Sequence, residues 1–218
     1  MTTDPQSRHL VVMDVDSTFI TGEVVEMLAA RAGSEELVTE ITEQAMRGEI
    51  DFAESLHKRV ATLAGLPEQV FADVLDEVVL TPGAVELVAE LDRRGWPVGL
   101  VSGGFIEIVE PLAARVGIRL VRANTLEVVD GRLTGRVAGA VVDRAAKAVA
   151  LRDYAAASGI PLERTVAIGD GANDLDMLAL AAVGVAFNAK PLVCEAADAV
   201  VRDRLDAVLE LPVFAQHA

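Results

Sequence analysis

Two carboxylates stand one residue apart, directly after a short apolar run. The run is Leu-Val-Val-Met at residues 10–13, and the carboxylates are Asp14 and Asp16. A run without alternating polar residues is typical of a strand buried on both faces of a parallel sheet. Both carboxylates then point the same way and repel each other, which favours a hard cation such as Mg²⁺ or a retained proton for acid–base chemistry. A solvated, aspartate-rich strand end is the structural alternative.

A second apolar strand, predicted at residues 98–101, ends in Ser102, Gly103 and Gly104. A helix is predicted to follow from Phe105. A hydroxyl and free backbone N–H groups at a helix N-terminus could hold an anion. An ordinary glycine turn between strand and helix would have the same sequence, so this signal is weak by itself.

A third strand, predicted at residues 165–168, leads into Gly-Asp-Gly-Ala-Asn-Asp at residues 169–174. Glycines let the backbone approach a ligand closely, and Asp170 and Asp174 add two more carboxylates. A capped helix start would explain Asn173 or Asp174 but not the whole cluster. The carboxyl ends of strands share one edge in an open α/β sheet, so the three strand ends together predict one site.

Three charged residues outside the strand ends could belong to that site. Lys147 lies early in a helix that Asp143 is predicted to cap, and it could reach a phosphate as a point charge. Glu23 and Arg59 lie in predicted helices. Lone charges on helices are usually solvated, so the residues themselves do not decide whether these three are functional.

The chain is predicted to fold as an α/β protein. Residues 19–78 read as successive helices without a convincing strand, while helices and strands alternate afterwards, with a β-hairpin around Asp130 and Gly131. We expect a doubly wound parallel sheet built from residues 1–18 and 79–218, interrupted after its first strand by a small helical cap of residues 19–78.

Composition narrows the classes of partner. The 218 residues include 34 acidic and 19 basic side chains, for a net charge of −15, which argues against nucleic acid or an anionic membrane as partner. An anionic substrate would therefore need local positive groups. A single cysteine, Cys194, fits a reducing compartment, and the polar N-terminus resembles no signal peptide. We expect a soluble cytoplasmic protein, as a monomer or homodimer.

The motifs also carry a resemblance to a known family. Four of them, in that family's order and on the expected strand ends, resemble the motifs of the haloacid dehalogenase superfamily: residues 14–18, residues 102–105, Lys147 and residues 169–174. A second group resembles the phosphoserine phosphatases within that superfamily: Glu23, Met46, Phe52, Arg59 and the Ala-Phe-Asn-Ala-Lys-Pro sequence at residues 186–191.

The resemblance implies an activity and its central residues. The expected reaction is Mg²⁺-dependent hydrolysis of O-phospho-L-serine through an aspartyl-phosphate, the last step of serine synthesis. Asp14 would be the nucleophile and Asp16 the general acid and base. The metal would be held by the Asp14 carboxylate, the Asp16 backbone carbonyl and Asp170.

The resemblance also assigns the residues that would bind substrate. Ser102, the Gly103 N–H and Lys147 would hold the phosphoryl oxygens, Asn173 would orient the group, and Asp174 would tether Lys147 or a metal-bound water. In the cap, Arg59 would pair with the substrate carboxylate and Glu23 with the substrate ammonium group. Met46 and Phe52 would exclude water.

Two alternatives stay open at this point. A relative could act on another small phosphomonoester, such as phosphoethanolamine or phosphohomoserine, or pass the phosphoryl group to an alcohol such as homoserine. More remotely, the chain could be a non-catalytic phosphoacceptor like a response-regulator receiver. A receiver has no use for Asp16 as an acid or base and carries no helical cap.

Overall fold

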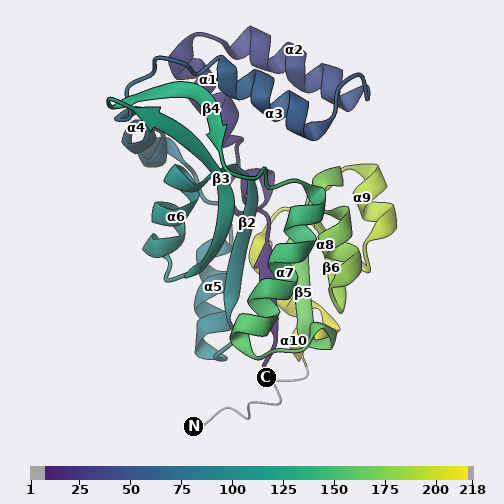
Figure 1. The fold of residues 1–218 in the computed structure, drawn as a ribbon. Coiled ribbons are helices and arrows are strands. Elements are labelled where there is room, and N and C mark those ends of the chain that lie inside the picture. The colour runs from purple at the N-terminus through teal and green to yellow at the C-terminus, as the bar shows by residue number, and fades with distance from the viewer. Residues whose placement is uncertain (1–7, 216–218) are drawn as a thin grey trace.

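The computed structural model describes residues 8–215, apart from the side chain of Met46, and shows one sheet of seven strands (Figure 1). The strand order is β4-β3-β2-β1-β5-β6-β7, and every neighbouring pair is parallel except β3 with β4. The strands are β1 (Leu10–Met13), β2 (Val98–Phe105), β3 (Leu120–Val129), β4 (Arg132–Ala138), β5 (Thr165–Gly169), β6 (Val183–Phe187) and β7 (Ala199–Val201). The prediction of a doubly wound, mainly parallel α/β sheet is confirmed.

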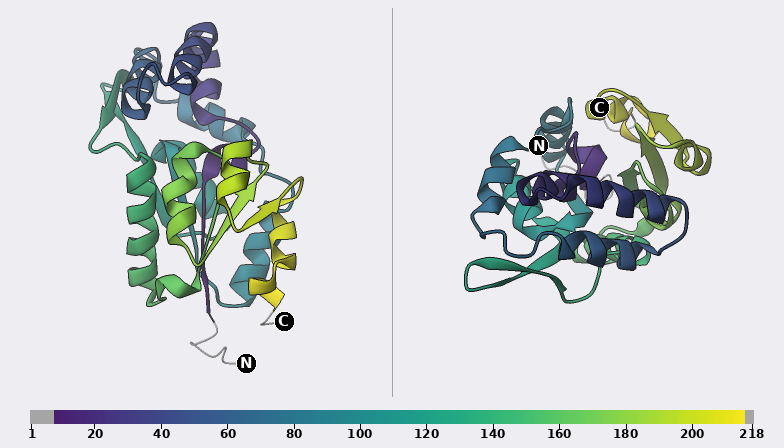
Figure 2. Two further views of the ribbon diagram at one scale, coloured as in Figure 1. Left: turned by 90° about the vertical axis from the view of Figure 1, so that its right-hand side faces the viewer. Right: turned by 90° about the horizontal axis from the view of Figure 1, so that it is seen from above.

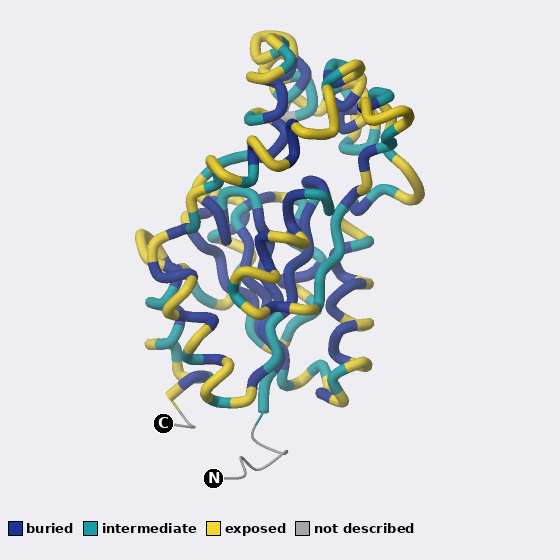
Figure 3. Tube along the Cα trace, turned by 90° about the vertical axis from the view of Figure 1, so that its left-hand side faces the viewer, coloured by how far each residue is buried: buried dark blue, intermediate teal, exposed yellow. Residues whose placement is uncertain are grey.

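Helices cover both faces of the sheet (Figure 2). Alternate residues of β1 show the two layers, because Val11 and Met13 pack in one apolar cluster while Leu10 and Val12 pack in the other. The first cluster is covered by α5 (Ala84–Arg93), α6 (Ile106–Arg115), η5 (Leu205–Glu210) and α10 (Pro212–Ala215). The second is covered by α7 (Arg144–Ser158), α8 (Leu175–Leu180) and α9 (Pro191–Ala196). The most deeply buried positions consequently run through the central strands (Figure 3).

A helical insertion follows β1 and lies over the carboxyl ends of the strands (Figures 1 and 2). Its helices are α1 (Val24–Ala32), α2 (Glu35–Met46), α3 (Phe52–Ala61) and α4 (Val70–Glu77). The local signals behave as expected: Gly33 ends α1 in a left-handed conformation, and Asp51 caps α3 by accepting from the Glu54 N–H at 2.7 Å. The two segments that connect the insertion to the sheet are themselves paired, because the Thr21 N–H donates to the Val79 carbonyl at 3.0 Å.

The hairpin of β3 and β4 differs from its prediction. The sequence predicts a β-hairpin around Asp130 and Gly131, whereas in the structure the first strand of the hairpin is the end of β3, one ten-residue strand that begins in the main sheet. Polar residues interrupt the apolar pattern in the middle of β3. Buried Asn124 is nevertheless satisfied there, since its side chain donates to the Gly103 carbonyl and accepts from the Val142 N–H, each at 2.8 Å.

The hairpin is hydrogen-bonded to the insertion. The N–H groups of Gly65 and Glu68 donate to the carbonyls of Leu133 and Gly131 at 2.8 and 2.9 Å, between α3 and α4. The predicted domains are residues 1–18 with 79–218 and residues 19–78. The hairpin belongs to the first and the loop between α3 and α4 to the second, yet the two are hydrogen-bonded to each other. Residues 120–138 link the sheet to the insertion. No helix in residues 8–215 is long and apolar enough to cross a membrane.

Helix α7, which carries Lys147, packs against β2 at a glycine. A Cβ on Gly99 would lie 2.6 Å from Cδ2 of the Tyr154 ring, closer than real carbon atoms approach. Tyr154 is buried and its hydroxyl donates to the Leu100 carbonyl at 3.1 Å, so the ring is held in place. The absence of a side chain at Gly99 thus determines how closely α7 approaches the sheet.

Gly99→Ala should destabilise the protein by about 2 kcal/mol, because the added methyl group overpacks the Tyr154 ring. Chemical denaturation measures this loss. In Tyr154→Leu the ring is gone and the methyl group has room, so the double variant should lose less than the sum of the single losses. Additive losses would mean that the ring contact is not the cause.

Candidate active site

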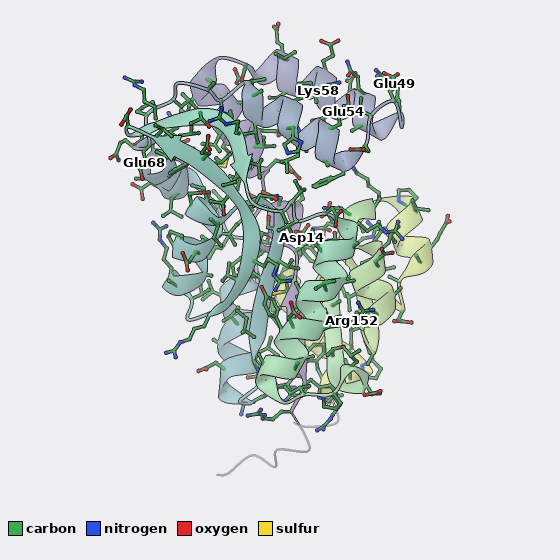
Figure 4. The ribbon with its side chains drawn as sticks, viewed as in Figure 1. Asp14, Glu49, Glu54, Lys58, Glu68 and Arg152 are labelled. Atoms are coloured by element: carbon green, nitrogen blue, oxygen red, sulfur yellow. The ribbon has the colours of Figure 1, made fainter. Side chains whose placement is uncertain are left out.

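A pocket of 640 Å³ lies between the insertion and the carboxyl ends of the strands. Figure 4 places Asp14 at this end of the sheet, facing the insertion that carries Glu54 and Lys58. Eight of the residues predicted to be functional line the pocket: Asp14, Asp16, Glu23, Phe52, Arg59, Gly103, Asp170 and Asn173. Three more lie beneath its floor as fully buried side chains: Ser102, Lys147 and Asp174. The side chain of the remaining residue, Met46, lies outside what the structure describes.

Lys147 forms a buried ion pair with two carboxylates. Its Nζ lies 2.7 Å from Oδ1 of Asp14 and 2.7 Å from Oδ1 of Asp174, and the lysine side chain has no exposed surface. Burial by itself would lower the pKa of Lys147, but the two carboxylates outweigh it and raise this pKa, so the ammonium group stays charged. Burial and the nearby Asp174 charge raise the pKa of Asp14 well above its ordinary value.

The glycine-rich turn after β5 positions Asp174. Its Oδ2 accepts from the N–H groups of Gly171 and Asp170 at 3.0 and 3.2 Å, while its Oδ1 contacts Lys147. A Cβ on Gly169 would lie 2.5 Å from the Asp174 carboxylate carbon, so only glycine permits this approach. The same turn places Asn173 on the pocket wall.

The turn after β1 holds Asp16 between the insertion and β2. Residues Val15–Phe19 form one wide turn, in which the Ile20 N–H donates to the Val15 carbonyl at 3.0 Å and Ser17 has a φ of +57°. Asp16 Oδ1 accepts from the Val24 N–H at 2.8 Å, and its Oδ2 accepts from the Ser102 hydroxyl at 3.0 Å. Burial raises the pKa of Asp16, so this carboxyl group is suited to holding a proton.

The Ser102–Gly104 segment corrects one sequence expectation. It does not form the N-terminus of a helix, because β2 continues to Phe105 and α6 begins at Ile106. The Gly104 N–H is also engaged, since it donates to Ser102 Oγ at 2.7 Å. A Cβ on Gly104 would lie 2.6 Å from Asp16 Oδ2, so the glycine makes room for the acid. The groups predicted to bind an anion therefore lie at a strand end.

Three carboxylates are grouped closely enough to share a metal ion. One oxygen each from Asp14, Asp170 and Asp174 lie within 4.8 Å of one another. Burial and the Asp174 charge raise the pKa of Asp170 to about 6, which is the repulsion that a divalent cation relieves. A donor set of oxygen atoms alone fits a hard divalent ion. The set predicted from sequence contained Asp16 instead of Asp174, whose two oxygens already contact Lys147 and the backbone.

At the insertion side of the pocket, Glu23 and Arg59 lie close enough for their charges to interact. Glu23 Oε1 accepts from the Ser17 hydroxyl at 2.9 Å, and burial together with the Asp16 charge raises the pKa of Glu23 to about 7. Burial lowers the pKa of Arg59, although Glu23 and Asp16 oppose this effect. Phe52 closes the gap to the sheet, because its ring edge lies 3.0 Å from where a Gly103 Cβ would stand.

Several residues that line the pocket were not predicted to be functional. Arg144, the first residue of α7, forms an ion pair with Asp176 on α8. Ser55 lies one helical turn before Arg59, so helical periodicity was the available signal. Lys190 lies within the 186–191 sequence, which contributed to the resemblance without a role of its own. Its N–H donates to the Asp170 carbonyl at 3.3 Å.

Comparison with known proteins agrees with this arrangement. Residues 11–179 match the family model of haloacid dehalogenase-like hydrolases. A curated relative, phosphoserine phosphatase SerB2 of Mycobacterium tuberculosis, is 57% identical over 207 residues. That alignment covers 94% of this chain but only 51% of the relative, so the chain spans about half of that protein's length.

Two solved structures match almost the whole chain. One is a substrate-bound phosphoserine phosphatase complex, with a TM-score of 0.88 and 40% identity over 93% of this chain and 97% of that one. The other is described as a phospho-aspartyl intermediate analogue of phosphoserine phosphatase, with a TM-score of 0.87 and 41% identity over 93% and 98% of the two chains. The chain therefore belongs to the haloacid dehalogenase-like hydrolases and, within them, to the family of phosphoserine phosphatases.

Proposed function

We propose that this protein is a Mg²⁺-dependent phosphatase that hydrolyses O-phospho-L-serine to L-serine and phosphate, the last step of serine synthesis. The observation that carries the proposal is that one pocket combines a carboxylate suited to attack phosphorus with two charged side chains suited to bind an amino acid. Asp14, held by Lys147, lies at one end, and the Glu23–Arg59 pair lies at the other. The matched relative and both matched structures are phosphoserine phosphatases, which supports the same substrate.

Asp14 is the nucleophile and Asp16 the proton carrier in this proposal. A bond forms between an Asp14 carboxylate oxygen and phosphorus while the bond from phosphorus to the seryl oxygen breaks, and Asp16 gives that oxygen its proton. Water then attacks the phosphorus and loses its proton to Asp16, which frees phosphate and regenerates the Asp14 carboxylate. The hydrogen bonds from Val24 and Ser102 keep Asp16 oriented for both transfers.

The phosphoryl oxygens are assigned to the Ser102 hydroxyl, the Gly103 N–H, Asn173 and Lys147. Lys147 neutralises charge from below while Asp174 keeps it in place. The proposed Mg²⁺ ligands are the Asp14 carboxylate, the Asp16 backbone carbonyl and Asp170, with Asp174 adjoining them. When bound, the metal ion polarises the phosphoryl group and offsets the negative charge of the nucleophile.

The insertion supplies recognition of the amino acid. Arg59 pairs with the substrate carboxylate, and Glu23 pairs with the ammonium group, which keeps Glu23 ionised despite its raised pKa. Phe52 and Met46 exclude water from the reacting phosphoryl group. Residues 19–78 would act as a cap over the core of residues 1–18 and 79–218. We further propose that the protein works in the cytoplasm as a monomer or homodimer.

Asp14→Asn should lower phosphate release from O-phospho-L-serine by roughly 10⁴-fold or more, because an amide cannot attack phosphorus. A malachite-green assay measures the release, and circular dichroism checks that the fold is retained. Asp73→Asn, which changes an exposed carboxylate on α4 that does not line the pocket, is the matched control. Appreciable activity in Asp14→Asn would contradict its assignment as nucleophile.

Arg59→Ala should lower kcat/KM for O-phospho-L-serine on the order of 100-fold, since a charge-assisted bond to the substrate carboxylate is lost. The comparison substrate is phosphoethanolamine, which has the ammonium group but no carboxylate and should lose far less. Wild-type preference for phosphoethanolamine would reopen the choice of substrate. Equal losses on both substrates would remove the carboxylate role of Arg59.

Mg²⁺ should raise the melting temperature more at about pH 7.5 than at about pH 5, because metal binding competes with protons on Asp170. The pKa of Asp170 is raised from 3.8 to about 6, so the folded metal-free protein holds a proton that the unfolded chain releases. The contribution of protonated Asp170 to the stability of the metal-free protein is fully present below pH 3.8 and is lost as the pH rises through about 6. Scanning fluorimetry with Mg²⁺ or EDTA measures this, and an equal increase at both pH values would contradict it.

A further inference from the structure

The chain has three lysines, which differ in burial and in their ion-pair partners. Lys58 is exposed on α3 and forms an ion pair with Glu54 at 2.8 Å. Lys147 is fully buried between Asp14 and Asp174. Lys190 is exposed on the pocket wall, and within residues 8–215 no carboxylate lies within ion-pair distance of it. Lys190 is therefore the lysine whose charge is available to a ligand.

The backbone around Lys190 is fixed beside the proposed metal site. The segment follows β6, where Asn188 adopts a left-handed conformation with a φ of +44° and its side-chain oxygen accepts from the Asp203 N–H at 3.0 Å. The Lys190 N–H donates to the Asp170 carbonyl, and Pro191 then begins α9. The side chain extends from this fixed backbone on the pocket wall, and its charge offsets part of the rise in the pKa of Asp170 that burial and the Asp174 charge cause.

Among the positively charged side chains that line the pocket, Lys190 differs from the others in its pairing. Three cations line the pocket. Arg144 is neutralised by Asp176, and Arg59 is half-buried and interacts with Glu23, Asp16 and Glu26. Five carboxylates line the same pocket: Asp14, Asp16, Glu23, Glu26 and Asp170. In a chain with a net charge of −15, a phosphate dianion meets repulsion until it comes close to an available positive charge.

We propose that Lys190 draws the phosphoryl group of the substrate into the pocket and raises the affinity for phosphate at its mouth. This role rests on the proposed phosphatase function, but it concerns the phosphoryl dianion and not the amino acid. It is distinct from that of Lys147, because Lys147 is buried beneath the floor and is already paired with two carboxylates. Lys190 acts by long-range electrostatic attraction, so its effect on phosphate affinity should weaken as the salt concentration rises.

The test measures kcat/KM of the full chain with Mg²⁺ for O-phospho-L-serine and p-nitrophenyl phosphate across a range of ionic strength. Lys190→Gln should lower kcat/KM for both substrates about fivefold at low salt, mainly through KM. The difference should disappear near 1 M salt, where the screening length is about 3 Å. Lys190→Arg should restore the value, and Lys58→Gln, which removes the same charge from α3, should behave as wild type.

Titration with inorganic phosphate by calorimetry provides a second readout that needs no turnover. Lys190→Gln should weaken phosphate binding by a similar factor, again only at low salt. A loss that persists in high salt, or that Lys190→Arg does not restore, would overturn the proposal in favour of a structural role. Unchanged salt dependence would overturn it as well. If wild type does not hydrolyse O-phospho-L-serine, the proposed function fails, while the phosphate titration still decides the role of Lys190.

Discussion

The buried contact of Lys147 with Asp14 and Asp174 is the interaction on which the rest of the site depends. Removing three charged groups from water is costly unless each is paired and hydrogen-bonded. Asp174 meets this condition with one oxygen on Lys147 and the other on two backbone N–H groups. Asp14 has Lys147 on one side and the pocket on the other, so its charge is only partly compensated by the protein. The uncompensated charge of Asp14 can bind a metal ion and attack a phosphoryl group.

Close backbone approaches make this contact possible. Gly169 admits the Asp174 carboxylate, and Gly99 lets Tyr154 bring α7, with Lys147 in it, against β2. Gly104 leaves room for Asp16 beside Ser102. A methyl group at any of these positions would displace its neighbour, which is Asp174, Tyr154 or Asp16. The glycines near the site are thus explained by the packing of specific neighbours and less by flexibility.

The insertion completes the pocket, and the hairpin holds the insertion to the sheet. The insertion contributes Glu23, Arg59 and Phe52, while the hairpin ties the loop between α3 and α4 to a strand of the main sheet. One apolar cluster runs continuously from the α5 and α6 side of the sheet into the insertion. A phosphorylated substrate that enters this acid-lined pocket needs compensating positive charge. The proposed roles of Arg59 and Lys190 meet this requirement at the two ends of one small molecule.

The amino-acid sequence by itself determined the class of fold and most of the proposed catalytic residues. The reason is local: each central strand and the polar groups at its end lie in one short segment, and carboxyl ends of parallel strands meet at one edge. Helix ends marked by Gly33 and Asp51 were equally readable. The resemblance to a family added roles that residue types alone left open, such as those of Glu23 and Arg59.

Only the tertiary structure decided which side chains compensate one another. The contact of Asp174 with Lys147, the extension of β2 through Ser102 and the burial of Asn124 within one long β3 all depend on segments distant in sequence. The exposed position of Lys190 on the pocket wall likewise became visible only in three dimensions. Local patterns report which faces are apolar. Burial and pairing of charges, which shift pKa values and create affinity, are set by long-range packing.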